Sequence, residues 1–294
     1  MSTPKTLLAD SLARSLSSNA AQHLRAARIA RVPDRSISAE GLRATLLHGG
    51  FPAPEPLLHL ETAAGGAAFP HGLWLGASCF LAASPSLRPK DLPRLGGDIV
   101  FPIFGNPDLL EEWESPFAMM GPSGAISLYD APHGPAPAYD SLAHFLEIEA
   151  LAPFSEALHV LRVDALCGDM LAGLVGAAPH APAPGAHAAG FVGEGVWVKE
   201  LRIGLEGPEG WGRSHGTFLL TENVDTIIDA MTLLLGEGHS FGHIGPTGTP
   251  PPGSKPIVTI YDEHPELGYR ARVEVTAWGE PGARVITHRE MRGA

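Results

Sequence analysis

The side chains best suited to binding gather in residues 104–124, which read FGNPDLLEEWESPFAMMGPSG. A large aromatic side chain inside a carboxylate cluster is typical of an interface for a basic protein partner. The alternative is a solvated acidic loop whose tryptophan packs into the protein's own core. The first interpretation predicts a partner-binding surface made by Asp108, Glu111, Glu112, Trp113, Glu114, Met119, Met120 and Asp130.

A second group of reactive side chains lies in residues 236–255, GEGHSFGHIGPTGTPPPGSK. His239 and His243 have a spacing that can ligate zinc or nickel when a helix holds both rings on one face. Gly242 lies between them and no helix is expected there, so the spacing does not enforce a ligand geometry. We expect a surface loop that joins a helix to a strand, with the two histidines as weak metal candidates.

The sequence has no H-E-x-x-H motif, and its two G-x-S-x-G matches, at 212–216 and 238–242, do not lie between an expected strand and an expected helix, as a nucleophile elbow requires. Cys79 and Cys167 lie in apolar segments, where buried free thiols are expected. The sequence therefore predicts no catalytic residue and no cofactor. It favours a binding protein over an enzyme, although scattered Ser, His and Asp side chains could still meet in space.

The chain is acidic: its 294 residues include 20 Lys and Arg against 32 Asp and Glu, a net charge of -12. Residues 91–170 alone hold 13 acidic and two basic residues, whereas residues 1–36 hold six basic and two acidic ones. Nucleic-acid phosphates are bound by clustered Lys and Arg, so direct binding to nucleic acid is disfavoured. The charge favours a basic protein partner.

The composition predicts a loop-rich α+β protein, with 44% hydrophobic residues, 18% charged residues, 35 Gly and 28 Pro. No window approaches 18 uninterrupted apolar residues, and the N-terminus lacks the apolar stretch of a secretory signal. We therefore expect a protein that does not span a membrane and remains in the cytoplasm.

The order of patterns divides the chain into four parts. A basic, amphipathic helical arm over 1–36 precedes an α+β domain over 37–155. A helical and Pro/Ala/Gly-rich junction over 156–190 leads to a second α+β domain over 191–294. Each domain is expected to pack helices on an antiparallel or mixed sheet. The arm, which carries a leucine stripe, is expected to pack on the acidic body or on a second copy, which leaves a homodimer open.

In the first domain, one helix is expected to begin at Ser38, and a second, within 51–66, is expected to end at Gly65. A third helix is expected to begin at Ser141. Strands are expected within 71–83, 98–105 and 124–130.

In the second half, Asn223 or Thr221 is expected to cap a helix that ends at Gly236. Helical stretches are expected at 155–163 and from Cys167, and strands at 196–203, 216–222, 256–262, 269–278 and 283–288.

The order of features over residues 38–152 resembles the SMI1/KNR4-type domains of the SUKH superfamily. FPAPEPLLHLETAAGG is similar to that family's opening "LP-x-x-Y" segment, and GAISLYD resembles its "G-x-I-x-x-D" strand. WESPFAMMGPSG and SLAHFL are similar to the family's aromatic loop and late helix. The family's aromatic residue near Glu55 and Pro56 is missing, and the last 100 residues resemble no family.

The resemblance implies a bacterial immunity protein of a polymorphic toxin system, related in role to toxin–antitoxin pairs. Such a protein binds a basic toxin domain, commonly one that acts on nucleic acid, and occludes its active site. The alternative is an enzyme or a protein that binds a small ligand or a metal, with its site near residues 236–254.

Overall fold

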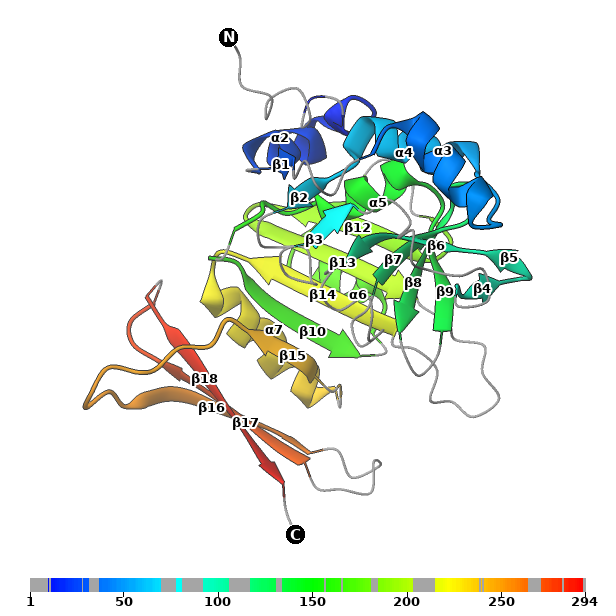
Figure 1. Ribbon diagram of the computed structural model, residues 1–294. Coiled ribbons are helices and arrows are strands. Elements are labelled where there is room, and N and C mark those ends of the chain that lie inside the picture. Colours follow the sequence, from blue (N-terminus) through cyan, green and yellow to red (C-terminus); the bar gives the residue numbers. More distant parts are fainter. Residues whose placement is uncertain are drawn as a thin grey trace. The chain divides into compact units, whose positions relative to one another are not determined.

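The computed structural model describes residues 10, 12–27, 29–31, 37–69, 78–80, 92–105, 117–130, 134–155, 157–164, 166–180, 185–202, 215–237, 239, 241–263, 271–281 and 283–292 (Figure 1). Its helices pack with antiparallel sheets, so the predicted α+β class is confirmed. None of the helices in these ranges is both long enough and apolar enough to cross a bilayer.

The chain forms two compact units. The first contains residues 1–156, 184–188 and 202–213, and the second contains residues 157–183, 189–201 and 214–294. The described residues of the predicted arm over 1–36, which lie within 10–31, belong to the first unit. Most of the expected junction belongs to the second unit, because it contributes an inner strand to that unit's sheet.

The first unit is built on a seven-stranded sheet in the order β1-β2-β3-β6-β7-β8-β9, in which every neighbouring pair is antiparallel. A small two-stranded sheet accompanies it. The strands are β1 (Ala30–Arg31), β2 (Ala67–Phe69), β3 (Ser78–Phe80), β4 (Arg94–Leu95), β5 (Asp98–Ile99), β6 (Phe101–Gly105), β7 (Phe117–Met120), β8 (Ile126–Asp130) and β9 (Gly134–Tyr139).

Two helices of the first unit begin where side-chain caps were expected. The Ser38 hydroxyl accepts from Gly41 N at the start of α3 (Ala39–His48), and that of Ser141 accepts from His144 N at the start of α5 (Leu142–Glu149). α4 (Glu55–Ala64) begins after Pro54 and ends at Gly65, as expected. Residues Ser18–Ala26 form the helix α2.

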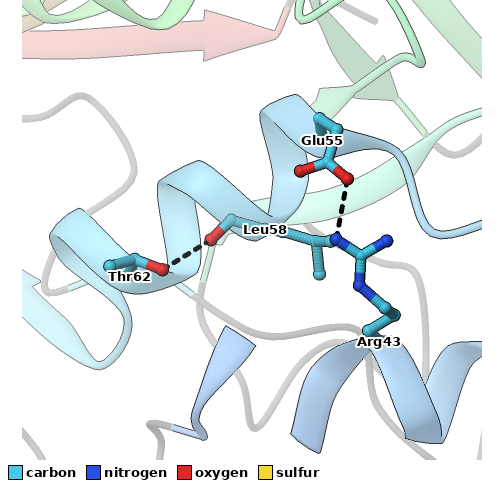
Figure 2. A network of polar contacts seen from close by, with 4 residues as sticks. All are labelled: Arg43, Glu55, Leu58 and Thr62. Carbon is cyan, nitrogen blue, oxygen red and sulfur yellow. Dashed lines mark hydrogen bonds and ion pairs between the residues drawn. The ribbon is translucent and has the colours of Figure 1, made fainter. Parts of the chain in front are cut away.

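An exposed ion pair links α3 to the first turn of α4, as Figure 2 shows. Arg43 Nη2 lies 2.7 Å from Glu55 Oε1, while the hydroxyl of Thr62 donates to Leu58 O one turn earlier in α4. Exposed pairs of this kind contribute about 0–1 kcal/mol. The packing of α4 therefore depends mainly on its buried residues Leu57, Leu58 and Leu60.

The second unit is built on a six-stranded sheet in the order β11-β12-β13-β14-β10-β15. Its core joins inward residues of this sheet to α6 (Gly168–Leu174) and α7 (Val224–Gly236). The helix α7 begins at Asn223, as expected, because the Asn223 side chain accepts from Asp225 N. The strands are β10 (His159–Asp164), β11 (Ala178–Pro179), β12 (Ala188–Gly193), β13 (Val196–Arg202), β14 (His215–Thr221) and β15 (Phe241–Gly245).

A three-stranded antiparallel meander completes the second unit: β16 (Pro256–Glu263), β17 (Ala271–Trp278) and β18 (Val285–Arg292). Val275, Ala277 and Ile286 lie on the face that joins the core containing α7. The expected antiparallel arrangement of these strands is confirmed.

Two local expectations in the second unit were wrong. Residues 159–164, expected to be helical, form β10, where buried Leu161 and Val163 alternate with half-buried Val160 and Arg162. This short apolar run also fits a helix. Pairing with β14 and β15 makes it a strand, in which every second residue is buried. Residues 241–245, expected within a loop, form β15 because Phe241 and Ile244 are buried beside β10.

Candidate functional site

Three of the eight predicted partner-binding residues, Met119, Met120 and Asp130, lie within the described ranges. Asp108, Glu111, Glu112, Trp113 and Glu114 lie outside the described residues. Asp130 is the last residue of β8, where its backbone is paired with Gly134.

Met119 and Met120 do not belong to the predicted surface. They lie in β7, between β6 and β8, and are only 0% and 2% exposed. Their apolar side chains are part of the core, so their place in the predicted surface was wrong.

The register of the sheet places both ends of residues 106–116, which we call the acidic segment, at the end of the sheet where Asp130 lies. Phe104 is paired with Ala118, and Phe117 is paired with Tyr129. Gly105 at the end of β6, Phe117 at the start of β7 and Asp130 at the end of β8 therefore lie at the same end of the sheet. A rigid antiparallel sheet thus fixes the points between which residues 106–116 run.

The same end of the sheet receives two other connections. The pair of Phe69 with Ser78 places both ends of residues 70–77 there, and the pair of Asp130 with Gly134 does so for residues 131–133. By composition, the three connecting segments contain four acidic residues, two tryptophans and no Lys or Arg. Connections that leave one end of a rigid sheet commonly carry binding residues.

The histidines of the second half are placed on or beside β15. The Nε2 of His239 lies 3.7 Å from Glu237 Oε2, and the His239 side chain is partly exposed. The backbone of His243 is paired with that of Arg162 in β10. Within the described ranges, His, Cys, Asp and Glu form no group of three or more that could hold a metal ion. Cys167, expected to be buried, is an exposed free thiol before α6.

A cluster of buried polar residues outside the predicted sites surrounds α5. The hydroxyl of Tyr139 donates to Glu149 Oε1 at 2.8 Å. Burial, and then the charge and hydrogen bond of Glu149, raise the pKa of Tyr139 well above its usual value. The phenol therefore stays protonated at neutral pH and serves as a donor rather than a base.

Helices α2 and α5 cap one another through four side chains, which we call the α2–α5 clasp: Ser17, Asn19, His23 and Glu147. The buried carboxylate of Glu147 accepts hydrogen bonds from Ser17 N at 2.9 Å and from the Ser17 hydroxyl. In return, Asn19 donates to Leu151 O and His23 Nδ1 lies 2.9 Å from Ala150 O. A carboxylate at one helix N-terminus and donors at another C-terminus satisfy the groups that helix ends leave open.

The sequence contained a weak signal for this clasp. Glu147 is one of two charged residues in the otherwise apolar stretch FLEIEAL, and Ser17 lies in the Ser-Ser-Asn run expected to interrupt the arm. In the folded protein, hydrogen bonds between Ser17 and Glu147 join α2 to α5. This arrangement holds the N-terminal segment on the body of the first unit.

His144, in the first turn of α5, is tightly enclosed. Its Nδ1 accepts from Asp140 N at 3.3 Å, and its ring packs edge-on against Tyr139 with centroids 5.8 Å apart. A Cβ on Gly185 would lie 2.1 Å from His144 Cε1, so a larger residue at position 185 would displace the ring. Within the described part of the chain, the buried Nε2 has no hydrogen-bond partner.

We expect His144 to make the stability of the protein depend on pH. Burial lowers its pKa, and the charges of Asp140 and Glu147 only partly oppose this effect. The unfolded chain, with a histidine pKa near about 6.5, then binds the proton more readily. The contribution of His144 to the free energy of unfolding is therefore complete above about pH 6.5, and it is lost as the pH falls toward the lower pKa of the folded state.

Denaturant unfolding of the wild type and of His144→Gln, from pH 7.5 to pH 5, measures this effect. The variant should lose less free energy of unfolding on acidification than the wild type. Parallel pH profiles for the two proteins would show that another group is responsible.

Comparison with known proteins adds no relative, because no protein-family model, no curated protein and no solved structure matches the chain.

Proposed function

We propose that this protein is an immunity-type binding protein that neutralises a cognate bacterial toxin. In this proposal an acidic surface at one end of the seven-stranded sheet covers the active site of a basic toxin domain. The toxin is expected to act on nucleic acid, because a domain that binds a polyanion also attracts a clustered set of carboxylates. The SUKH-like order of motifs over residues 38–152 leads to the same class of protein.

One observation carries the proposal: the register of β6, β7 and β8 gathers both ends of the acidic segment and Asp130 at one end of a rigid sheet. Residues 106–116 contain four carboxylates and no basic residue.

The charge also favours rapid association. A net charge of -12, with 13 acidic residues against two basic ones in residues 91–170, attracts a basic partner over distances of about 8 Å at physiological ionic strength. Electrostatic steering of this kind raises the association rate more than the intrinsic affinity.

Affinity capture tests the proposal. Immobilised wild-type protein is incubated with lysate of the producing strain, and the captured proteins are identified by mass spectrometry. A basic protein with a secreted toxin domain, whose activity disappears on adding the immunity protein, supports the proposal. Capture of no such protein, or turnover of a small molecule at a site distant from the acidic segment, contradicts it.

With the captured toxin domain in hand, we expect Glu111→Lys/Glu112→Lys to lower the association rate about tenfold at low salt. The wild-type rate should fall as salt is added, and the variant rate should change little. Surface plasmon resonance over a salt series measures both rates.

The matched control is Asp98→Lys/Glu194→Lys, which makes the same change in charge at an exposed position of β5, next to the opposite end of β6, and at an exposed position of the second unit. Equal slowing by both double variants would show that net charge alone, and not the acidic segment, steers the partner.

A further inference from the structure

A loop over residues 246–255, all of which the structure describes, joins β15 to β16 in the second unit. It contains three consecutive prolines, Pro250, Pro251 and Pro252, and no acidic residue. None of its residues belongs to a helix or a strand, and Figure 1 shows it as the orange trace between the two strands. Most connections between elements need only about four to six residues, so this loop is longer than a simple connection.

The prolines restrict the backbone of the loop to an extended conformation. A proline ring fixes φ at about −65°, and a residue that precedes a proline is kept out of the α region. Pro250 and Pro251 meet both conditions, which together give the polyproline II conformation. Because proline has no N–H, this part of the loop also cannot pair as an inner strand with the protein's own sheets.

Both ends of the proline segment are held by the fold. Before the prolines, the N–H of Gly248 donates to Ile286 O of β18 at 2.8 Å. After them, Ser254 N donates to Pro251 O at 3.1 Å, and Gly253 has a φ of +81°. This is the geometry of a type II turn, with proline at its second position and glycine at its third. The conformation of the segment is therefore set before any partner binds.

Two of the three prolines are available to a partner. Pro250 is half-buried, whereas Pro251 and Pro252 are exposed. A polyproline II helix has three residues per turn, so one of its edges can face the protein while the other two face solvent. Pro256 is also exposed and the side chain of Ile257 is 52% exposed, which adds apolar surface at the start of β16.

We propose that residues 249–257 are a docking segment for a protein domain whose groove is lined by aromatic side chains. Such grooves recognise polyproline II segments because the preformed conformation loses little entropy on binding. The rings of Pro251 and Pro252 fill the groove. Polyproline II has no internal hydrogen bonds, so the carbonyl groups of Thr249 and Pro250 accept hydrogen bonds from the groove. The proposal is independent of the toxin-binding function, which concerns the first unit.

Differential capture from a lysate of the producing strain tests the proposal with the full chain. The loop variant is Pro251→Ala/Pro252→Ala, and the matched control is Pro179→Ala/Pro281→Ala, which removes two exposed prolines elsewhere in the second unit. We expect the wild type and the control to capture a protein whose recovery falls about tenfold or more with the loop variant. Both rings and the restriction on the unbound backbone are lost in that variant. Circular dichroism confirms that each variant is folded.

Decaproline, which forms a polyproline II helix without any protein around it, tests the nature of the groove in the purified partner. It should displace the full chain from the partner. Decaproline has no aromatic group, so a change in tryptophan or tyrosine fluorescence on its addition comes from the partner's own side chains. Equal capture of every protein by the wild type and the loop variant overturns the proposal. A partner that decaproline does not displace, or whose fluorescence it leaves unchanged, also overturns it.

Discussion

Glu147→Ala is expected to lower the free energy of unfolding by about 3 kcal/mol, because two hydrogen bonds to a buried carboxylate are lost together. The variant leaves Ser17 N and the Ser17 hydroxyl without their Glu147 acceptor at the N-terminus of α2. The α2–α5 clasp then retains only the contacts of Asn19 and His23 with the last carbonyls of α5. Denaturant unfolding followed by circular dichroism measures the loss.

Two further variants show whether the loss comes from the clasp. Ser17→Ala removes the hydroxyl but keeps the backbone N–H, so it should cost less than Glu147→Ala. Glu61→Ala is the matched control for removing a buried carboxylate, because Glu61 Oε1 accepts from Ile37 N elsewhere in the same unit. Hydrogen exchange in residues 17–27 should increase in Glu147→Ala and not in Glu61→Ala. Unchanged exchange in Glu147→Ala would show that the clasp does not hold α2.

Trp113→Ala is expected to raise the dissociation rate of the toxin complex by roughly 30-fold, the factor that corresponds to about 2 kcal/mol at a central aromatic anchor. The association rate should change little, because the substitution removes no charge. Surface plasmon resonance with the captured toxin domain separates the two rates.

Leu233→Ala controls for the loss of an apolar side chain, since Leu233 is exposed on α7 in the other unit. It should leave both rates unchanged. If Trp113→Ala instead lowers the melting temperature and leaves the dissociation rate unaltered, the tryptophan packs into the core and is not an anchor.

The sequence by itself determined those features that depend on neighbouring residues. The caps at Ser38, Ser141 and Asn223 were predicted because a capping side chain bonds to a backbone N–H only two or three residues away. The antiparallel strands of the meander were predicted from alternation within β17. The α+β class followed from the sum of such local patterns.

Tertiary structure decided what depends on residues distant in the chain. Ser17 and Glu147, separated by 130 positions, meet only because α2 packs on α5, and no local pattern encodes that pairing. A short apolar run became β10 because β14 and β15 pair with both of its edges. Met119 and Met120 are buried because β6 and β8 flank β7, although their neighbours in sequence are acidic. Backbone hydrogen bonds and burial between distant segments outweigh local preference, so these features follow from the folded chain alone.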